Sequence, residues 1–309
     1  MKKRIQGVFR LVPLAIVVST MILGQGRAKE PDISTILDRV GERVKAHYLD
    51  LQKFTWTDTV RQQFLKEDRS PESKERSLVY EMTIRLDEAI PRPEIPPPLP
   101  PFFTKELSEL VSVDGAPFQK GKLPELSDSK AGDLGLLWIL LWAPKREDGR
   151  YRFSYAGQAE LEGRKTLLVN ITYPPKVFPV GLINYTIRDT DRVPQVQWQG
   201  DSFMVRVQQT GNIWIDPDTY DVLRLETRTK PFEFDNPNGG GKLKFEFEQT
   251  ARFLSMQFEN PKQSLMVPNS LETVRTIKGR QPPVLRILHS FGNYKRFAAD
   301  VKVTPTELR

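Results

Sequence analysis

The sequence predicts a mainly β fold of the α+β class, with roughly ten strands and two helices in a single domain. The strand prediction comes from segments that alternate apolar and polar residues. In the clearest of them, Leu243, Phe245 and Phe247 alternate with lysine and glutamate. Such alternation is typical of an antiparallel sheet with one buried face. The helix prediction comes from an amphipathic segment near the N-terminus and a later segment that is apolar on every side.

Residues 1–28 have the pattern of a secretory signal peptide. Four basic residues precede an apolar run from Leu11 to Leu23, and small residues end at Ala28. The run is shorter than the roughly 20 residues that a helix needs to cross a bilayer, which disfavours the alternative of an uncleaved anchor. We therefore expect a mature chain of residues 29–309 that is periplasmic or secreted and has no membrane span.

Removal of residues 1–28 leaves a chain that is close to neutral. The full sequence has 46 Lys/Arg and 39 Asp/Glu, and five of the basic but none of the acidic residues lie in that segment, which leaves 41 against 39. Nucleic-acid binding needs clustered Lys and Arg that neutralise phosphates, so we expect no nucleic-acid partner. The sequence has no cysteine, and so it offers neither disulfides nor thiolate metal ligands nor a lipid-attachable cysteine.

The amphipathic helix is predicted over residues 33–51. Apolar residues recur there at helical spacing, and Asp32 or Ser34 can cap the first turn. Strands are predicted over residues 54–64 and 78–86, which are rich in β-branched and aromatic residues. The stretch between these two strands is charged and contains a proline, so we expect it to connect them in a first hairpin.

A proline-rich loop is predicted over residues 91–101, where seven of eleven residues are proline. Proline fixes φ and removes an amide donor, so neither a helix nor a sheet continues through this segment. A stiff surface loop is the first interpretation, and a docking motif for an aromatic-lined groove is the alternative. A strand over residues 107–113 follows, and the turn pair Asp114-Gly115 ends it.

Further hairpins are predicted in the second half of the chain. Alternating residues at 151–155 and 167–173 flank a turn region that contains Glu162-Gly163. Strands at 213–215 and 222–225 flank a turn, and two last strands are predicted over 271–277 and 284–297.

The second predicted helix covers residues 134–142 and is apolar on every side. A helix of this kind has no face suited to water, so it must be buried. Two interpretations remain open: a core helix wedged under the sheet, or a plug or lid that fills a hydrophobic cavity and is displaced when a ligand enters. In the second interpretation the ligand-binding residues are Leu134, Leu137, Trp138, Leu141 and Trp142.

The sequence offers little for catalysis. Its two histidines, His47 and His289, lie in or beside apolar stretches, where a structural role is expected. It has no nucleophile elbow and no paired-histidine zinc motif. The run Gly239-Gly240-Gly241-Lys242 is similar to a phosphate-binding loop, but a strand and not a helix follows it, so we expect a hairpin turn.

A calcium loop is one interpretation of Asp216, Asp218 and Asp221. The spacing lacks the glycine and the distal glutamate that such a loop uses. A tight turn explains Asp-Pro-Asp equally well, because proline presets φ while aspartate accepts from the turn amides. We therefore expect a turn here, with no metal and no cofactor in the protein.

Four segments carry a resemblance to a known family: Val-Asp-Gly-Ala-Pro at 113–117, Gly-Asn-Ile-Trp-Ile-Asp-Pro-Asp at 211–218, Val-Leu-Arg-Leu at 222–225 and Asn-Tyr-Lys-Arg-Phe at 293–297. In this order, with the early helix and the apolar Leu/Trp segment, they resemble the LolA/LolB-like superfamily of outer-membrane lipoprotein-sorting proteins. The chain is similar to a long variant found among bacterial exported proteins, over roughly residues 32–300.

The resemblance implies a curved antiparallel half-barrel sheet wrapped around helices, with a cavity that holds acyl chains and residues 134–142 at that cavity. We expect a non-catalytic exported protein that binds a lipid or another hydrophobic ligand in a concave apolar cavity. Each buried acyl methylene contributes about 0.8 kcal/mol, so an apolar cavity alone gives useful affinity. The alternative is a protein-interaction or sensor module that binds an envelope protein without a small-molecule ligand, and an enzyme is the third class considered.

Overall fold

The computed structural model of the chain describes seven stretches: residues 31–88, 102–118, 151–186, 195–235, 241–259, 262–279 and 284–296. The predicted signal peptide, the proline-rich segment 91–101 and the apolar segment 134–142 lie outside these residues, so the predictions for them stay predictions.

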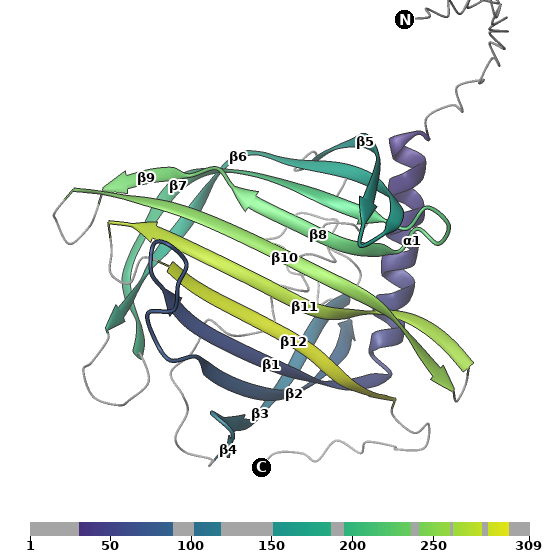
Figure 1. The fold of residues 1–309 in the computed structure, drawn as a ribbon, viewed down its shortest axis with the longest axis horizontal. Coiled ribbons are helices and arrows are strands. Elements are labelled where there is room, and N and C mark those ends of the chain that lie inside the picture. The colour runs from purple at the N-terminus through teal and green to yellow at the C-terminus, as the bar shows by residue number, and fades with distance from the viewer. Residues whose placement is uncertain are drawn as a thin grey trace, which may run out of the picture. The chain divides into compact units, whose positions relative to one another are not determined.

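The described elements are one helix and twelve strands (Figure 1). They are α1 (Ile33–Leu51), β1 (Phe54–Leu65), β2 (Arg76–Glu88), β3 (Phe102–Val113), β4 (Ala116–Pro117), β5 (Arg152–Leu161), β6 (Arg164–Thr186), β7 (Gln195–Ile215), β8 (Val222–Thr229), β9 (Phe232–Asp235), β10 (Lys242–Glu259), β11 (Lys262–Lys278) and β12 (Val284–Arg296).

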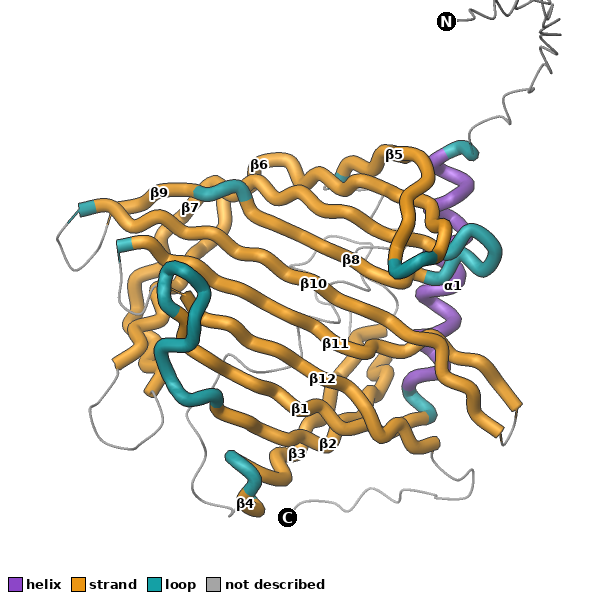
Figure 2. Tube along the Cα trace, viewed as in Figure 1, coloured by secondary structure: helices purple, strands orange, loops and turns teal. Residues whose placement is uncertain are grey.

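All strand pairs are antiparallel and form one sheet in the order β4-β3-β2-β1-β12-β11-β10-β8-β7-β6-β5, with β9 paired to β10. Neighbours in the sheet are mostly neighbours in the chain. There are two exceptions: β8 lies beside β10, and β12 lies between β11 and β1, so that the last described strand pairs with the first. The sheet is open and curved, and α1 runs across one end of it (Figure 2). The predicted fold class, a mainly β half-barrel sheet with an N-terminal helix, is confirmed.

Helix α1 forms where its apolar residues recur at helical spacing. Its N-cap is Asp32, whose extended backbone lets the carbonyl accept from Ile36 N at 3.1 Å. The stripe of Ile36, Val40 and Val44 is buried, and the helix packs against β1, β5 and β11. The predicted helix and its buried face are confirmed.

The first hairpin and the later strands also lie where they were predicted, but several strands are longer than their patterns indicated. β6 continues to Thr186 and β7 begins at Gln195. The pair Pro174-Pro175 lies inside β6, at a register shift between Tyr173 and Lys176. A register shift leaves residues out of the ladder, so these prolines do not have to supply amide donors to it.

Two predicted turns have the backbone of tight hairpins. Asp114 and Gly115 have φ of 50° and 81°, and Glu162 and Gly163 have φ of 52° and 80°. Two consecutive residues with positive φ match the twist of the flanking strands. The sequence signal at both turns is confirmed.

Candidate functional site

The position of α1 distinguishes the two faces of the sheet. We call the face that packs against α1 the helix face and the opposite one the outer face. Side chains alternate between the faces along a strand, so Trp56, Asp58, Val60 and Gln62 of β1 share the helix face with Phe54. All five are buried. We take the helix face as the candidate ligand site, because the resemblance stated from the sequence implies a cavity on the side of the sheet that faces the helix.

The residues predicted to bind the ligand cannot be placed on this face. All of them lie outside the described residues, and their role stays a prediction: Leu134, Leu137, Trp138, Leu141 and Trp142.

The first apolar cluster of the helix face is closed by α1. Ile36, Val40 and Val44 pack with buried residues of the strands, among them Phe54 and Leu225. We call this set the helix cluster. Its strand residues come from β1, β2, β6, β7, β8, β10, β11 and β12, so one helix holds most of the sheet together at this end.

Asp221 connects α1 to the sheet by polar contacts. It directly precedes β8, and its carboxylate accepts from Arg43 Nε at 2.8 Å and from Arg43 Nη2 at 3.1 Å. His47 Nε2 lies 2.8 Å from the same carboxylate. Burial alone would raise the pKa of Asp221, but the hydrogen bonds from His47, Arg43 and Thr219 outweigh it and hold this pKa well below its usual range. The carboxylate is therefore ionised where α1 docks.

The Asp216-Pro217-Asp218 segment forms the predicted turn. Asp216 Oδ1 accepts from the amides of Asp218 and Thr219, at 2.9 and 3.0 Å. The prediction that an aspartate accepts from the turn amides is confirmed. Within the described stretches of the chain, no group of three His, Cys, Asp or Glu residues is placed to hold a metal ion.

A second apolar cluster lies farther along the helix face, and strands alone form it. Its buried members are Val60, Leu78, Leu285 and Ile287, with Phe64, Tyr80, Leu110 and Val113 packed against them. We call these eight residues the strand cluster. It includes residues of β1, β2, β3 and β12 and no residue of α1. The helix face therefore stays apolar beyond the residues that α1 covers.

A buried polar pair lies between the two clusters on β1 and β12, whereas Tyr80 on β2 packs against both clusters. Asp58 lies between Trp56 and Val60 on the helix face of β1, and its Oδ2 is 2.9 Å from His289 Nδ1 on β12. Asp58 and His289 are 1% and 5% exposed. Asp58 Oδ1 and Trp56 Nε1 have no hydrogen-bond partner among the residues described. Each of the two predicted structural histidines, His47 and His289, is thus bonded to a buried carboxylate.

The buried carboxylate of Asp58 also acts on Tyr294, which lies near the end of β12. Its hydroxyl donates to the carbonyl of Pro268 at 2.6 Å. Burial, and then the negative charge of Asp58, raises the pKa of Tyr294 well above its usual value. The boundary between the clusters is therefore an electrostatically distinct part of an otherwise apolar face.

A row of small and polar residues crosses the helix face on the remaining strands. The register aligns Gly211, Thr227, Gln249 and Thr273 on β7, β8, β10 and β11. Gln249 Nε2 donates to Thr273 Oγ1 at 3.4 Å, whereas Thr227 Oγ1 has no partner among the described residues. The sequence did not reveal this row or the Asp58–His289 pair, because only the strand register brings these residues together.

Comparison with known proteins gives matches among solved structures. No protein-family model and no curated protein matches the chain. An outer membrane lipoprotein-sorting protein domain from Vibrio parahaemolyticus is 11% identical, with 88% of this chain and 96% of that chain covered at a TM-score of 0.34. A DUF1329 family protein from Desulfovibrio piger is also 11% identical, with 88% and 95% covered at a TM-score of 0.32.

The Pseudomonas aeruginosa MucA/MucB complex provides a further match, 9% identical, with 86% of this chain and 100% of that chain covered at a TM-score of 0.21. Over the described residues, no helix is both long enough and apolar enough to cross a bilayer.

Proposed function

We propose that this protein is an exported, non-catalytic carrier that holds the acyl chain of a lipid, or a similar hydrophobic molecule, against the helix face of its sheet. The observation that carries the proposal is the strand cluster, which continues the apolar surface beyond α1 without a residue from that helix. An acyl chain placed along it gains about 0.8 kcal/mol for each buried methylene. Residues 1–28 are then the signal peptide, and the mature chain works in the periplasm or outside the cell.

The polar boundary between the clusters supports a defined position for the ligand headgroup. Asp58 Oδ1 and Trp56 Nε1 are buried and lack partners among the described residues. An unsatisfied buried acceptor or donor costs about 1–3 kcal/mol, so a headgroup that bonded to either atom would gain affinity from it. In this arrangement the acyl chain lies on the strand cluster and the headgroup lies near Asp58.

Two measurements test the carrier proposal. Native mass spectrometry of the protein purified gently from its own host should show adducts with the mass of an acyl lipid. After delipidation, a fluorescent fatty acid should bind saturably. Leu110→Ala should weaken that binding about tenfold, because it removes apolar contact worth about 1.4 kcal/mol from the strand cluster. Leu37→Ala in the helix cluster is the matched control, and it should lower stability while leaving the affinity of the folded protein unchanged.

The absence of both adducts and saturable probe binding would refute the carrier proposal. The protein would then be assigned to the alternative class, an envelope protein-interaction or sensor module. Equal effects of Leu110→Ala and Leu37→Ala on probe affinity would instead refute the placement of the ligand on the strand cluster.

A further inference from the structure

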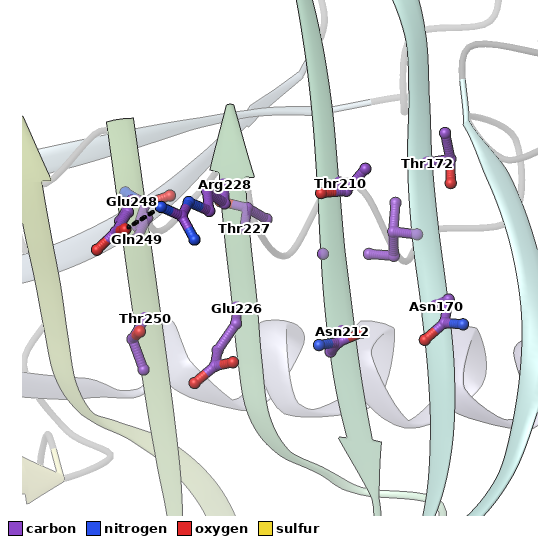
Figure 3. A pocket seen from close by; sticks show the side chains of 12 residues that line it. Asn170, Thr172, Thr210, Asn212, Glu226, Thr227, Arg228, Glu248, Gln249 and Thr250 are labelled. Atoms are coloured by element: carbon purple, nitrogen blue, oxygen red, sulfur yellow. Dashed lines mark ion pairs between the residues drawn. The ribbon is translucent and has the colours of Figure 1, made fainter. Parts of the chain in front are cut away.

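A pocket of about 590 Å³ lies where β6, β7, β8 and β10 run side by side (Figure 3). Among the residues that line it, Ile171, Thr227 and Gln249 belong to the helix face and are buried. Their neighbours Asn170 and Arg228 point the other way and are exposed. The pocket therefore opens on the outer face, turned away from α1 and from the proposed acyl-chain site.

Neutral polar side chains cover much of this pocket. Asn170 on β6 is directly opposite Asn212 on β7, and Thr250 on β10 belongs to the same cross-strand row. Thr172 and Thr210 form the next opposed pair. Within the part of the chain that the structure describes, none of these five side chains has a hydrogen-bond partner. Their donors and acceptors are free to meet a ligand.

Strand propensity does not explain the asparagines. An outer face of threonine and charged residues is ordinary for an antiparallel sheet with one wet side. Asparagine is depleted in strands, however, because its side chain competes for backbone hydrogen bonds. Two asparagines placed opposite each other in neighbouring strands, inside a pocket, are better explained by a role in binding.

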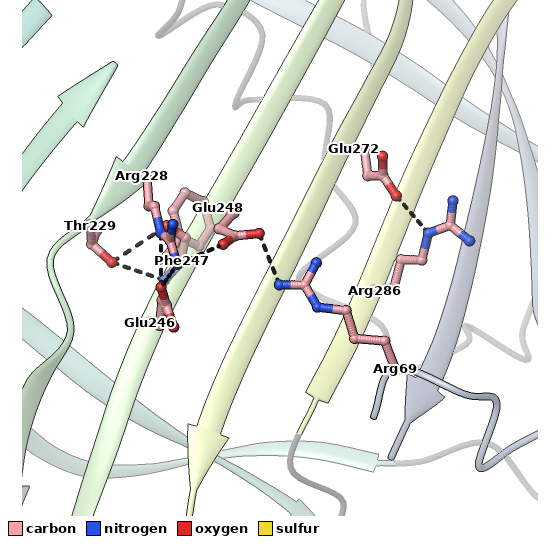
Figure 4. Close-up of polar contacts among 8 residues, drawn as sticks. All are labelled: Arg69, Arg228, Thr229, Glu246, Phe247, Glu248, Glu272 and Arg286. Carbon is pink, nitrogen blue, oxygen red and sulfur yellow. Dashed lines mark hydrogen bonds and ion pairs between the residues drawn. The ribbon is translucent and has the colours of Figure 1, made fainter. Parts of the chain in front are cut away.

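The charged residues that share a cross-strand row with Thr172 and Thr210 are Arg228 and Glu248, and both are already in ion pairs. Arg228 donates from Nε to Glu246 at 2.8 Å, and its Nη2 lies 3.2 Å from Glu248 (Figure 4). Glu248 also accepts from Arg69 Nη2 at 3.2 Å. The Arg228 guanidinium is thus held between the carboxylates of Glu246 and Glu248. An anionic ligand would have to compete with both carboxylates for it.

The remaining acid of the pocket is paired as well. Glu226 accepts from Arg224, whose guanidinium also lies 5.2 Å from the centroid of the Trp214 ring. The charged side chains that line the pocket are therefore all in ion pairs. The groups without a partner there are side-chain amides and hydroxyls.

We propose that this outer-face pocket binds a neutral polyhydroxylated ligand, an oligosaccharide. An asparagine amide offers two donors and an acceptor, and a threonine hydroxyl offers both roles, which suits adjacent sugar hydroxyls. The volume lies within the range of about 300–1,000 Å³ that is typical of small-molecule sites. The site lies on the opposite face of the sheet from the acyl-chain site and does not depend on it.

Isothermal titration calorimetry of the purified protein tests this assignment with three neutral probes, cellotetraose, maltotetraose and chitotetraose, and with anionic tetragalacturonate as the contrast. At least one neutral tetrasaccharide should bind saturably, and more tightly than tetragalacturonate. Asn212→Ala should weaken that binding at least tenfold, and Thr210→Val about threefold. Ser290→Ala, on the outer face of β12 and outside the pocket, should leave the affinity unchanged.

Three results would overturn the assignment. The first is no binding of any neutral tetrasaccharide at millimolar concentration, and the second is tighter binding of tetragalacturonate. The third is an unchanged affinity in Asn212→Ala. If that variant fails to fold, Asn170→Ala, on the exposed opposite strand, takes its place with the same expected loss.

Discussion

The helix cluster and the strand cluster share one face of one sheet, but they are closed in different ways. The helix cluster is covered by α1, and the ion pair of Asp221 with Arg43 fixes that helix to the start of β8. The strand cluster is built from β1, β2, β3 and β12 alone, and the Asp58–His289 pair marks its boundary. The difference separates the part of the face that maintains the fold from the part that we propose to bind a ligand.

The comparison predicts that matched core truncations will behave differently in the two clusters. Phe54 is fully buried in the helix cluster, with its ring centroid 4.6 Å from that of Phe258. Phe54→Ala should lower the free energy of unfolding by about 3–5 kcal/mol. The affinity of the folded protein for a fluorescent fatty acid should not change. The measurements are denaturant titration and probe binding on the same sample.

Ile287→Ala is the counterpart in the strand cluster. It should cost about 2–5 kcal/mol in stability, and it should also weaken probe binding. If Phe54→Ala weakened probe binding as much as Ile287→Ala, the two clusters would form one functional surface and the distinction between them would be lost.

Sequence patterns predicted the helix and strands of this face well. They did not predict which residues of different strands meet on it. The period of α1 and the alternation in β1 each depend on one segment, so Val40 and Val60 could be predicted as buried from their neighbours. Strand lengths were less predictable. Pro174 indicates an interruption in a single strand, and only the partner strand β7 shows that a register shift accommodates it.

The polar contacts of the helix face could not have been predicted from single segments. Asp58 and His289 are 231 residues apart, and they meet because β12 returns to pair with β1. Nothing in either segment indicates that return. Likewise, Asp221 was considered as a calcium ligand because of its neighbours in the turn, whereas its partners come from α1.

Removal of the Asp221 carboxylate tests whether α1 is held by charge as well as by packing. Asp221→Asn should lower the free energy of unfolding at pH 7 by about 2 kcal/mol, because it removes the charged acceptor of the hydrogen bonds from His47 and from the partly exposed Arg43 guanidinium. Asp218→Asn, on the exposed side of the same turn, is the control and should change stability by less than about 0.5 kcal/mol.

The pH dependence of that difference follows from the direction of the pKa shift. The folded pKa of Asp221 lies below its ordinary value of 3.8, so the carboxylate stabilises the fold above that pH, and its contribution falls as the pH drops further towards the folded pKa. The stability gap between the parent protein and Asp221→Asn should therefore be constant from pH 7 to pH 5 and smaller at pH 3. A gap that is already lost at pH 5 would mean that another group controls the contact.

A substitution at Gly211 tests how closely the strands approach each other at the polar row of the helix face. A Cβ at this position would stand 2.2 Å from the carbonyl oxygen of Glu226, so β7 and β8 must shift to accept one. Gly211→Ala should cost about 1–3 kcal/mol, the usual range for overpacking. Gly292→Ala is the matched control, because a Cβ there meets no atom within 4 Å. Equal stability of the two variants, measured by thermal unfolding, would show that the close approach at Gly211 is not maintained.

The smallest change in stability is expected for the segment that was predicted to line the cavity. If residues 134–142 cover the ligand site as a plug or lid, Trp138→Leu should change the affinity for a fluorescent fatty acid severalfold while altering the free energy of unfolding by less than about 1 kcal/mol. A fixed core helix predicts the reverse, because truncation of a packed aromatic residue to alanine costs about 3–5 kcal/mol. Phe54→Leu in the helix cluster is the control for an aromatic residue inside the fixed core, since Phe54 is fully buried there. If Trp138→Leu loses as much stability as Phe54→Leu and binds the probe normally, residues 134–142 belong with the helix cluster, and the ligand is held by the strand cluster alone.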